Sequence, residues 1–82
     1  MFVVLTYDAE SERLSKIQKT CKKYLLPVQS AVFEGYLTEK RLRLLKEDIA
    51  RAIDPEKDHV VIYVMSYGDQ FQKLEIGKRA RK

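Results

Sequence analysis

The residue best suited to chemistry in this 82-residue chain is Asp8, which follows directly on the apolar segment Phe2–Tyr7. We expect this segment to form a buried strand, because most of its side chains prefer to leave water. A buried strand is a rigid support for the residue at its tip, so Asp8 is our candidate for an active centre. The residues alone favour a plainer alternative, in which Asp8 accepts hydrogen bonds from backbone amides at the start of a helix.

Other chemistries have less support. The single cysteine, Cys21, excludes an internal disulfide and a CxxC or zinc pattern, and its helical spacing with Ile17 and Tyr24 predicts a small core residue. The only histidine, His59, stands beside Asp58 at the entrance of an expected strand, where exposed imidazoles are common, so we do not favour a general-base role. The three glycines form no phosphate-binding loop, which argues against ATP use.

The net charge of +4 comes entirely from residues 73–82, so the first 72 residues are neutral overall. Basic side chains on a reachable surface contact phosphates without reading base sequence. Lys16, on an expected helix, has two interpretations that we weigh equally: it complements the helix dipole, or it follows a phosphate backbone. The nucleic-acid contacts that we predict are Arg13, Lys16, Lys78, Arg79, Arg81 and Lys82.

Helical and extended patterns alternate along the rest of the chain. Ser11 and Thr38 are expected helix N-caps, and Gly35 suggests a bulge or bend in the extended segment that contains it. That segment is either one bent strand or two short ones. The expected elements after the first strand are a helix over 11–25, extended structure over 28–37, a helix to 53, a strand over 59–66, a turn at 68–69 and an edge strand over 71–76.

These elements predict one α+β domain over residues 1–77 and a basic C-terminal tail over 78–82. Two helices with one apolar face each should cover a single side of a mainly antiparallel sheet, which is a ferredoxin-like sandwich. The uncovered face should be too apolar for water, with Phe33, Tyr36 and Tyr63 on it, so we expect a homodimer through this face. Whether the last strand pairs within its own sheet or with the partner's stays open.

The sequence also excludes some classes of protein. A hydrophobic fraction of 45% is too high for a disordered chain. No apolar run approaches the roughly 20 residues that span a bilayer, so we expect no membrane association. The apolar start has no basic leader and no small-residue cleavage site, which predicts a cytoplasmic protein.

Three motifs together resemble a known family, the small CRISPR-associated nuclease that partners the CRISPR integrase in spacer acquisition. They are the strand that ends in Tyr7-Asp8, the segment 28–35 (VQSAVFEG) followed by Leu37-Thr38-Glu39, and the segment 53–58 (IDPEKD) before the next strand. The resemblance runs from residue 2 to about residue 77. The chain departs from the family at Ala31, where serine is frequent, and in its short basic tail, where many members have a hydrophobic ending.

The resemblance implies a ferredoxin-like homodimer, a divalent metal held by Asp8, and a metal-dependent endoribonuclease or DNase that works with the integrase subunits in antiviral defence. Mg²⁺ commonly uses one or two carboxylates with waters and substrate phosphates, so two copies of Asp8 across a dimer axis would form a weak site. Two alternatives stay open: a non-catalytic dimeric scaffold that binds duplex DNA within the integrase complex, and a small-ligand regulatory dimer. The choice between RNA and DNA also stays open.

Overall fold

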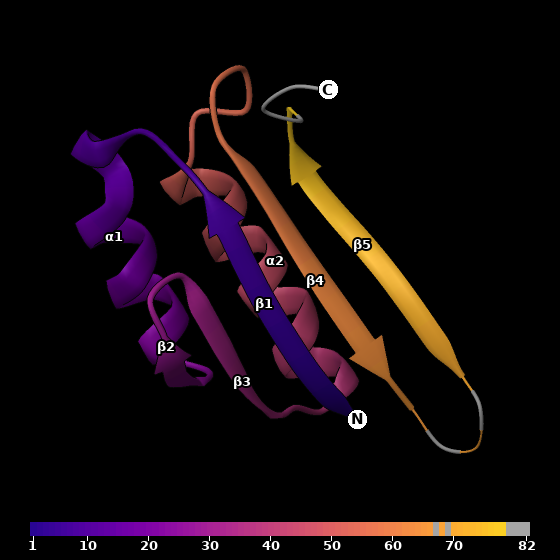
Figure 1. The fold of residues 1–82 in the computed structure, drawn as a ribbon. Helices are drawn as coiled ribbons and strands as arrows, with labels where there is room; N and C mark the ends of the chain where they lie inside the picture. The colour runs from indigo at the N-terminus through magenta and orange to yellow at the C-terminus, as the bar shows by residue number, and fades with distance from the viewer. Residues whose placement is uncertain (67, 69, 79–82) are drawn as a thin grey trace.

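A computed structural model describes residues 1–66, 68 and 70–78 of the chain. Its five strands form one sheet, and both helices pack on the same side of that sheet (Figure 1). The elements in chain order are β1 (Phe2–Asp8), α1 (Ser11–Lys22), β2 (Leu26–Gln29), β3 (Val32–Tyr36), α2 (Glu39–Ala52), β4 (His59–Met65) and β5 (Phe71–Gly77). The predicted α+β sandwich is confirmed.

The strand order is β2-β3-β1-β4-β5, and every neighbouring pair is antiparallel. The first strand of the chain therefore lies at the centre of the sheet, with β3 on one side and β4 on the other. The first four strands have the order of the ferredoxin-like fold, and β5 is added at one edge. Neither helix in the described part of the chain is long and apolar enough to cross a membrane.

Side chains of β1 alternate between two environments, as the pleat of a strand requires. Val3, Leu5 and Tyr7 are buried beneath the helices, whereas the residues between them point to the open face. Leu5 lies opposite Phe33 of β3 and Ile62 of β4, and all three are in the core. The central strand is thus fixed by packing on one face only.

The two helices begin in different ways. Thr38 is the N-cap of α2, as predicted, and its Oγ1 accepts a hydrogen bond from the Arg41 amide at 3.1 Å. Ser11 was predicted to cap α1, and this is wrong: Ser11 is the first helical residue, and its predecessor Glu10 occupies the cap position without a side-chain hydrogen bond. α1 also ends at Lys22, earlier than predicted, since the chain must turn to enter β2.

The extended segment predicted over 28–37 is two short strands, β2 and β3, joined by a turn in which Ala31 has a φ of 62°. The pairing register shifts between Pro27 and Gln29, so the irregularity lies in β2. The bulge predicted near Gly35 is therefore misplaced. Gly35 is instead a position of close packing, because a Cβ there would lie 3.2 Å from Leu25 Cδ2.

β5 pairs with β4 of the same chain along its whole length, from Phe71 opposite Met65 to Gly77 opposite His59. The predicted edge strand is confirmed in position (Figure 1). Gly68, in the connection before it, has a φ of 69°, and Asp69, the other residue of the predicted turn, lies outside the described residues.

Candidate metal and nucleic-acid site

Asp8 ends β1 on the open face of the sheet, at the end where α1 begins (Figure 1). It pairs with His59, the first residue of β4, and His59 pairs in turn with Gly77, the last residue of β5. Three adjacent strands therefore contribute one residue each to a single row. We call this row, Asp8–His59–Gly77, the Asp8 row.

The Asp8 carboxylate is exposed and has no hydrogen-bond or ion-pair partner within the described residues. The sequence alone favoured a capping role for it, but the amide of Glu10 donates to Asp58 Oδ1 at 3.0 Å instead. Both Asp8 oxygens thus keep their lone pairs for other ligands. The β1 backbone supports the side chain from beneath, because its neighbour Tyr7 is buried and stacks on Phe33.

Asp58 is a fully buried carboxylate close to this row. Arg13 donates to it twice, from Nε at 2.5 Å and from Nη2 at 3.0 Å, and the amides of Glu10 and Asp54 donate as well. The hydrogen bond from Arg13, together with the two amides, lowers the pKa of Asp58 to about 2. Sequence reasoning missed this residue, although it closes the IDPEKD segment that carried the family resemblance.

Arg13 was predicted to contact phosphate, and the structure places its guanidinium in the ion pair with Asp58. Its side chain is 18% exposed, and Nη1 also pairs with Glu12 at 3.0 Å. Hydrogen bonding to Asp58 raises the pKa of Arg13. The ion pair by itself accounts for an arginine at this position, and contact with nucleic acid stays a prediction.

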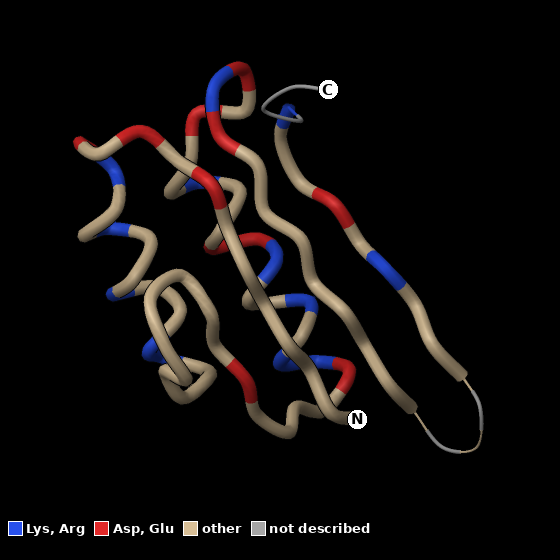
Figure 2. The backbone as a smooth tube through the Cα atoms, viewed as in Figure 1, with Lys and Arg blue, Asp and Glu red and all other residues tan. Residues whose placement is uncertain are grey.

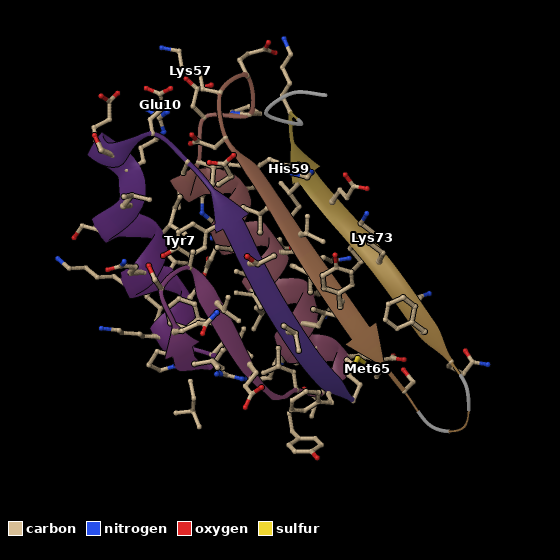
Figure 3. The ribbon with its side chains drawn as sticks, viewed as in Figure 1. Tyr7, Glu10, Lys57, His59, Met65 and Lys73 are labelled. Atoms are coloured by element: carbon tan, nitrogen blue, oxygen red, sulfur yellow. The ribbon has the colours of Figure 1, made fainter. Side chains whose placement is uncertain are left out.

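His59 differs from the exposed imidazole expected at a strand entrance, because its side chain is only 13% exposed. Its Nε2 lies 2.9 Å from Oε1 of Glu75 on β5, and Lys73 Nζ lies 3.8 Å from the other oxygen of that carboxylate. Figure 3 shows His59 and Lys73 on neighbouring strands. The Asp8 row is thus bordered by a small charged network that sequence spacing did not reveal.

A divalent metal would find few ligands here in a single chain. Within the described residues, no three His, Cys, Asp or Glu side chains come together in a way that could hold one. Asp8 supplies a hard oxygen donor, which suits Mg²⁺ with waters and phosphate oxygens as the remaining ligands. The donor set fits a weak magnesium site that needs a substrate or a second subunit to complete it.

The other predicted nucleic-acid contacts lie on two surfaces. Lys16 is exposed on α1, where basic positions follow the helix (Figure 2). Lys78 is exposed directly after β5, and its amide donates to the Asp58 carbonyl oxygen at 2.9 Å. Arg79, Arg81 and Lys82 lie outside the described residues. Lys78 directly follows Gly77 of the Asp8 row, and acidic positions gather around the tip of β1 (Figure 2).

The open face of the sheet becomes apolar away from Asp8. Phe2 meets Tyr36 edge to face at 5.0 Å between ring centroids, and Tyr63 stacks on Phe71 at 6.0 Å. Tyr36 and Tyr63 are on this face as predicted, but Phe33 is not. It is 3% exposed and packs under the helices, because it lies opposite Leu5 in the register of β1 and β3.

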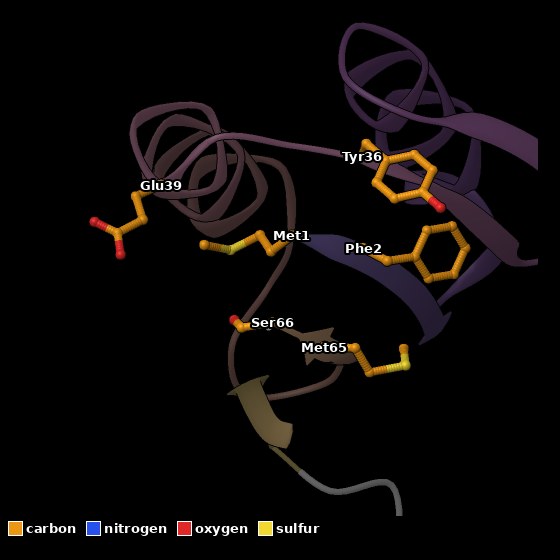
Figure 4. Close-up of a pocket in the computed structure, with 6 residues that line it drawn as sticks. All are labelled: Met1, Phe2, Tyr36, Glu39, Met65 and Ser66. Carbon is orange, nitrogen blue, oxygen red and sulfur yellow. The ribbon is translucent and has the colours of Figure 1, made fainter. Parts of the chain in front are cut away.

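The apolar end of this face also borders a pocket of about 540 Å³. Met1, Phe2, Tyr36 and Met65 line it together with Glu39 and Ser66 (Figure 4). The pocket lies at the opposite end of β1 from Asp8, so it belongs to a different part of the surface from the candidate metal site.

Cys21 is buried in α1, as predicted for a core residue. Burial raises the pKa of its thiol to about 12, so the thiol is protonated and unreactive at neutral pH.

Comparison with a family model and with individual known proteins points to one and the same family. The family model described as CRISPR associated protein Cas2 matches residues 1–73. The protein named CRISPR-associated endoribonuclease Cas2 of Dictyoglomus turgidum is 38% identical over 85 residues, covering 100% of this chain and 97% of the relative. The protein of the same name from Thermotoga maritima is 38% identical over 77 residues, covering 94% of this chain and 88% of the relative.

The fold is similar to solved structures as well. A crystal structure of Streptococcus pyogenes Cas2 at pH 6.5 matches with a TM-score of 0.73 and 30% identity, over 80% of this chain and 87% of that one. A second crystal structure, described as cas2, matches with a TM-score of 0.73 and 38% identity, over 77% of this chain and 71% of that one. The family resemblance read from the sequence motifs is confirmed.

Proposed function

The chain belongs to the Cas2 family of CRISPR-associated proteins, and we propose that it is a metal-dependent endonuclease of CRISPR adaptation that acts through Asp8. Relatives that carry the name endoribonuclease support a phosphodiesterase activity. The observation that carries the assignment to Asp8 is its exposed carboxylate, which has no partner in the described part of the chain and stands on a rigid strand.

A bound Mg²⁺ would supply a water made more acidic and a positive charge beside the phosphoryl oxygens. The chain's own contribution is to hold Asp8 at the tip of β1 and to leave both of its carboxylate oxygens open to ligands. Basic side chains such as Lys78 would attract the phosphate backbone without reading its sequence.

A homodimer through the open face would complete the site. Tyr36 is 81% exposed and Phe71 is 59% exposed, and both lie on this face with Phe2 and Tyr63. Packing two such faces about a twofold axis removes aromatic surface from water. It would also bring two copies of β1 together, so that two Asp8 carboxylates could share one cation.

Substitution of Asp8 by Asn tests the proposal. We expect Asp8→Asn to abolish Mg²⁺-dependent cleavage of RNA or DNA and to leave dimerisation and duplex binding intact, because the side chain keeps its size but loses its charge. Glu47→Gln is the matched control, since it removes one exposed carboxylate from α2, on the helix side of the molecule. Unchanged cleavage by rigorously purified Asp8→Asn protein would refute the catalytic assignment.

The sparse metal-ligand set among the described residues favours a second candidate function, a dimeric scaffold that holds a duplex between integrase subunits without cutting it. Spacer acquisition by the Asp8→Asn variant decides between the two. If acquisition persists while cleavage is lost, the scaffold is the biological role. If both are lost together, catalysis at Asp8 is required.

Contact between the tail and nucleic acid has its own test. Removal of residues 78–82 takes away Lys78, Arg79, Arg81 and Lys82. We expect duplex affinity to fall equally for all sequences and its salt dependence to flatten, by a slope of about 0.9 for each phosphate that the shortened chain no longer neutralises. Titration at several salt concentrations measures this, and an unchanged slope would place the tail away from the duplex.

A further inference from the structure

We propose that Asp58 is the positioning residue of the Asp8 site: it holds both the turn that follows Asp8 and the point where the basic tail begins. The inference rests on the function proposed for Asp8. It gives a role to the buried carboxylate and to the IDPEKD segment that ends with it.

The side chain of Asp58 holds the turn after Asp8. Oδ1 accepts from the Glu10 amide at 3.0 Å, and Oδ2 accepts from the Asp54 amide at 2.8 Å. Glu10 lies two residues beyond Asp8 and occupies the N-cap position of α1, which has no side-chain cap of its own. A carboxylate from the loop before β4 therefore satisfies the amide of the N-cap residue itself and sets the path between β1 and α1.

Arg13 closes this arrangement from the first turn of α1. Its Nε and Nη2 donate to the two oxygens of Asp58, so the buried carboxylate is paired by charge as well as by hydrogen bonds. A buried carboxylate with all these partners has little freedom to move, and loss of its charge leaves donors unpaired. Glu10 and Lys57 lie at the same end of the molecule (Figure 3).

The main chain of Asp58 holds the start of the tail. Its carbonyl oxygen accepts from the Lys78 amide at 2.9 Å. Gly77, just before, has a φ of 89°, and a Cβ at that position would lie 2.2 Å from the same carbonyl oxygen. Only glycine lets β5 approach so closely. Lys78 consequently leaves the sheet beside the Asp8 row.

The two functions of Asp58 are linked through one short loop. The Asp58 amide donates to the Asp54 carbonyl at 2.8 Å, while the Asp54 amide donates to the Asp58 carboxylate. Loosening the carboxylate should therefore also loosen the backbone that carries the carbonyl oxygen. A residue that only held the start of α1 would not affect the Lys78 amide. An effect at both Glu10 and Lys78 therefore identifies Asp58 as a positioning residue of the whole site.

Amide hydrogen exchange in the full-length protein tests the linkage. In Asp58→Asn we expect the amides of Glu10 and Lys78 both to exchange about tenfold faster relative to the core amide of Leu5. Asp48→Asn is the matched control: Asp48 is also a hydrogen-bonded carboxylate, bound to Tyr24 and Arg51 on the helix layer. It should leave the Glu10 and Lys78 amides unchanged. A response of Glu10 alone, or of neither amide, overturns the proposal.

Gly77→Ala leaves the Asp58 carboxylate intact and perturbs the Asp58 carbonyl group instead. It therefore provides a second test if Asp58→Asn folds poorly. The added Cβ must displace the Asp58 carbonyl, so exchange should rise at Lys78 and also at Glu10. Gly68→Ala is the control, because Gly68 also has a positive φ but a Cβ added there would have no atom within 4 Å. If the Glu10 amide exchanges as slowly in Gly77→Ala as in Gly68→Ala, the linkage is refuted.

Mn²⁺-induced broadening of the Asp8 amide signal separates this inference from the proposed function. In the wild-type protein, Mn²⁺ should broaden the signal, and Asp58→Asn should require about tenfold more Mn²⁺ for the same effect. Absence of broadening in the wild type would refute metal binding at Asp8 and leave the exchange result to decide on Asp58. Equal Mn²⁺ affinity in wild type and variant, with normal broadening, would overturn the positioning role.

Discussion

The two faces of the sheet are built from alternate residues of the same strands, and they have different roles. On β1, Val3, Leu5 and Tyr7 are buried under the helices, whereas Phe2 and Asp8 belong to the open face. The covered face is lined by large apolar side chains along β1 and is closed by α1 and α2. The open face changes from aromatic at the Phe2 end to charged at the Asp8 end. One strand can therefore provide both the core and the proposed site, because its pleat separates them.

The difference implies that stability and function can be altered separately. Substitutions on the covered face should lower the free energy of unfolding, while those on the open face should alter association or chemistry in a folded protein. Asp58 is the exception, since it is buried and yet contacts the backbone around the Asp8 row.

The largest effect on stability is expected for Leu5→Ala, on the covered face. Leu5 is 0% exposed at the centre of the sheet, so its truncation should lower the free energy of unfolding by about 2–5 kcal/mol. Thr6→Ala, the next residue but half-buried on the open face, should lower it by about 1 kcal/mol or less, through lost strand propensity. Urea unfolding of both variants measures the contrast, and equal losses would mean that the faces do not differ.

A smaller effect is expected from acid, through Asp58. Its pKa is lowered to about 2, chiefly by Arg13, so the unfolded chain binds a proton at this carboxyl more readily than the folded one. The resulting stabilisation is complete above the ordinary carboxyl pKa near 4 and is lost as the pH falls toward 2. Urea unfolding between pH 7 and pH 2 should show this loss, and Asp58→Asn should lack that component. If the free energy of unfolding depends on pH in the same way in the wild type and in Asp58→Asn, this prediction is wrong.

The smallest effect on the stability of a single chain is expected for Tyr36→Ser, at the aromatic end of the open face. Because Tyr36 is 81% exposed, its replacement costs the monomer mainly the edge-to-face contact with Phe2 and some strand propensity, about 1 kcal/mol or less. Self-association should weaken clearly, as sedimentation can measure. Gln18→Ser, an exposed residue of α1, is the control. A dimer as stable as the wild type's would exclude this end of the face from the interface.

Local patterns in the sequence predicted the elements well. Apolar periodicity located both helices and the strands over Phe2–Tyr7 and His59–Ser66, and Thr38 was correctly identified as a cap. Phe33 was assigned to the same face as Tyr36, which requires a bulge between them such as the one expected near Gly35. The pairing of β1 with β3 is regular there, so these two residues, three apart on one strand, lie on opposite faces.

The wrong predictions at the site have another cause: the residues that interact there are far apart in the sequence. Asp8 satisfies the local rule for accepting a hydrogen bond from the Glu10 amide, but Asp58, 48 residues beyond Glu10, accepts it instead. The contact of His59 with Glu75 likewise spans 16 residues. Such pairs form only when the sheet register is set. Asp8 could be singled out in advance, while the groups that hold its surroundings could not.

Strand β2 has a further consequence, for the behaviour of the protein at high concentration. It is an outer strand with exposed apolar side chains, Leu26 at 71% and Val28 at 51%, and such an edge invites a neighbouring chain to add a strand. Pro27 has no N–H to offer, and the shifted register beside it interrupts the regular spacing of backbone groups. We therefore expect this edge to be a poor template for fibrils despite its two exposed apolar side chains.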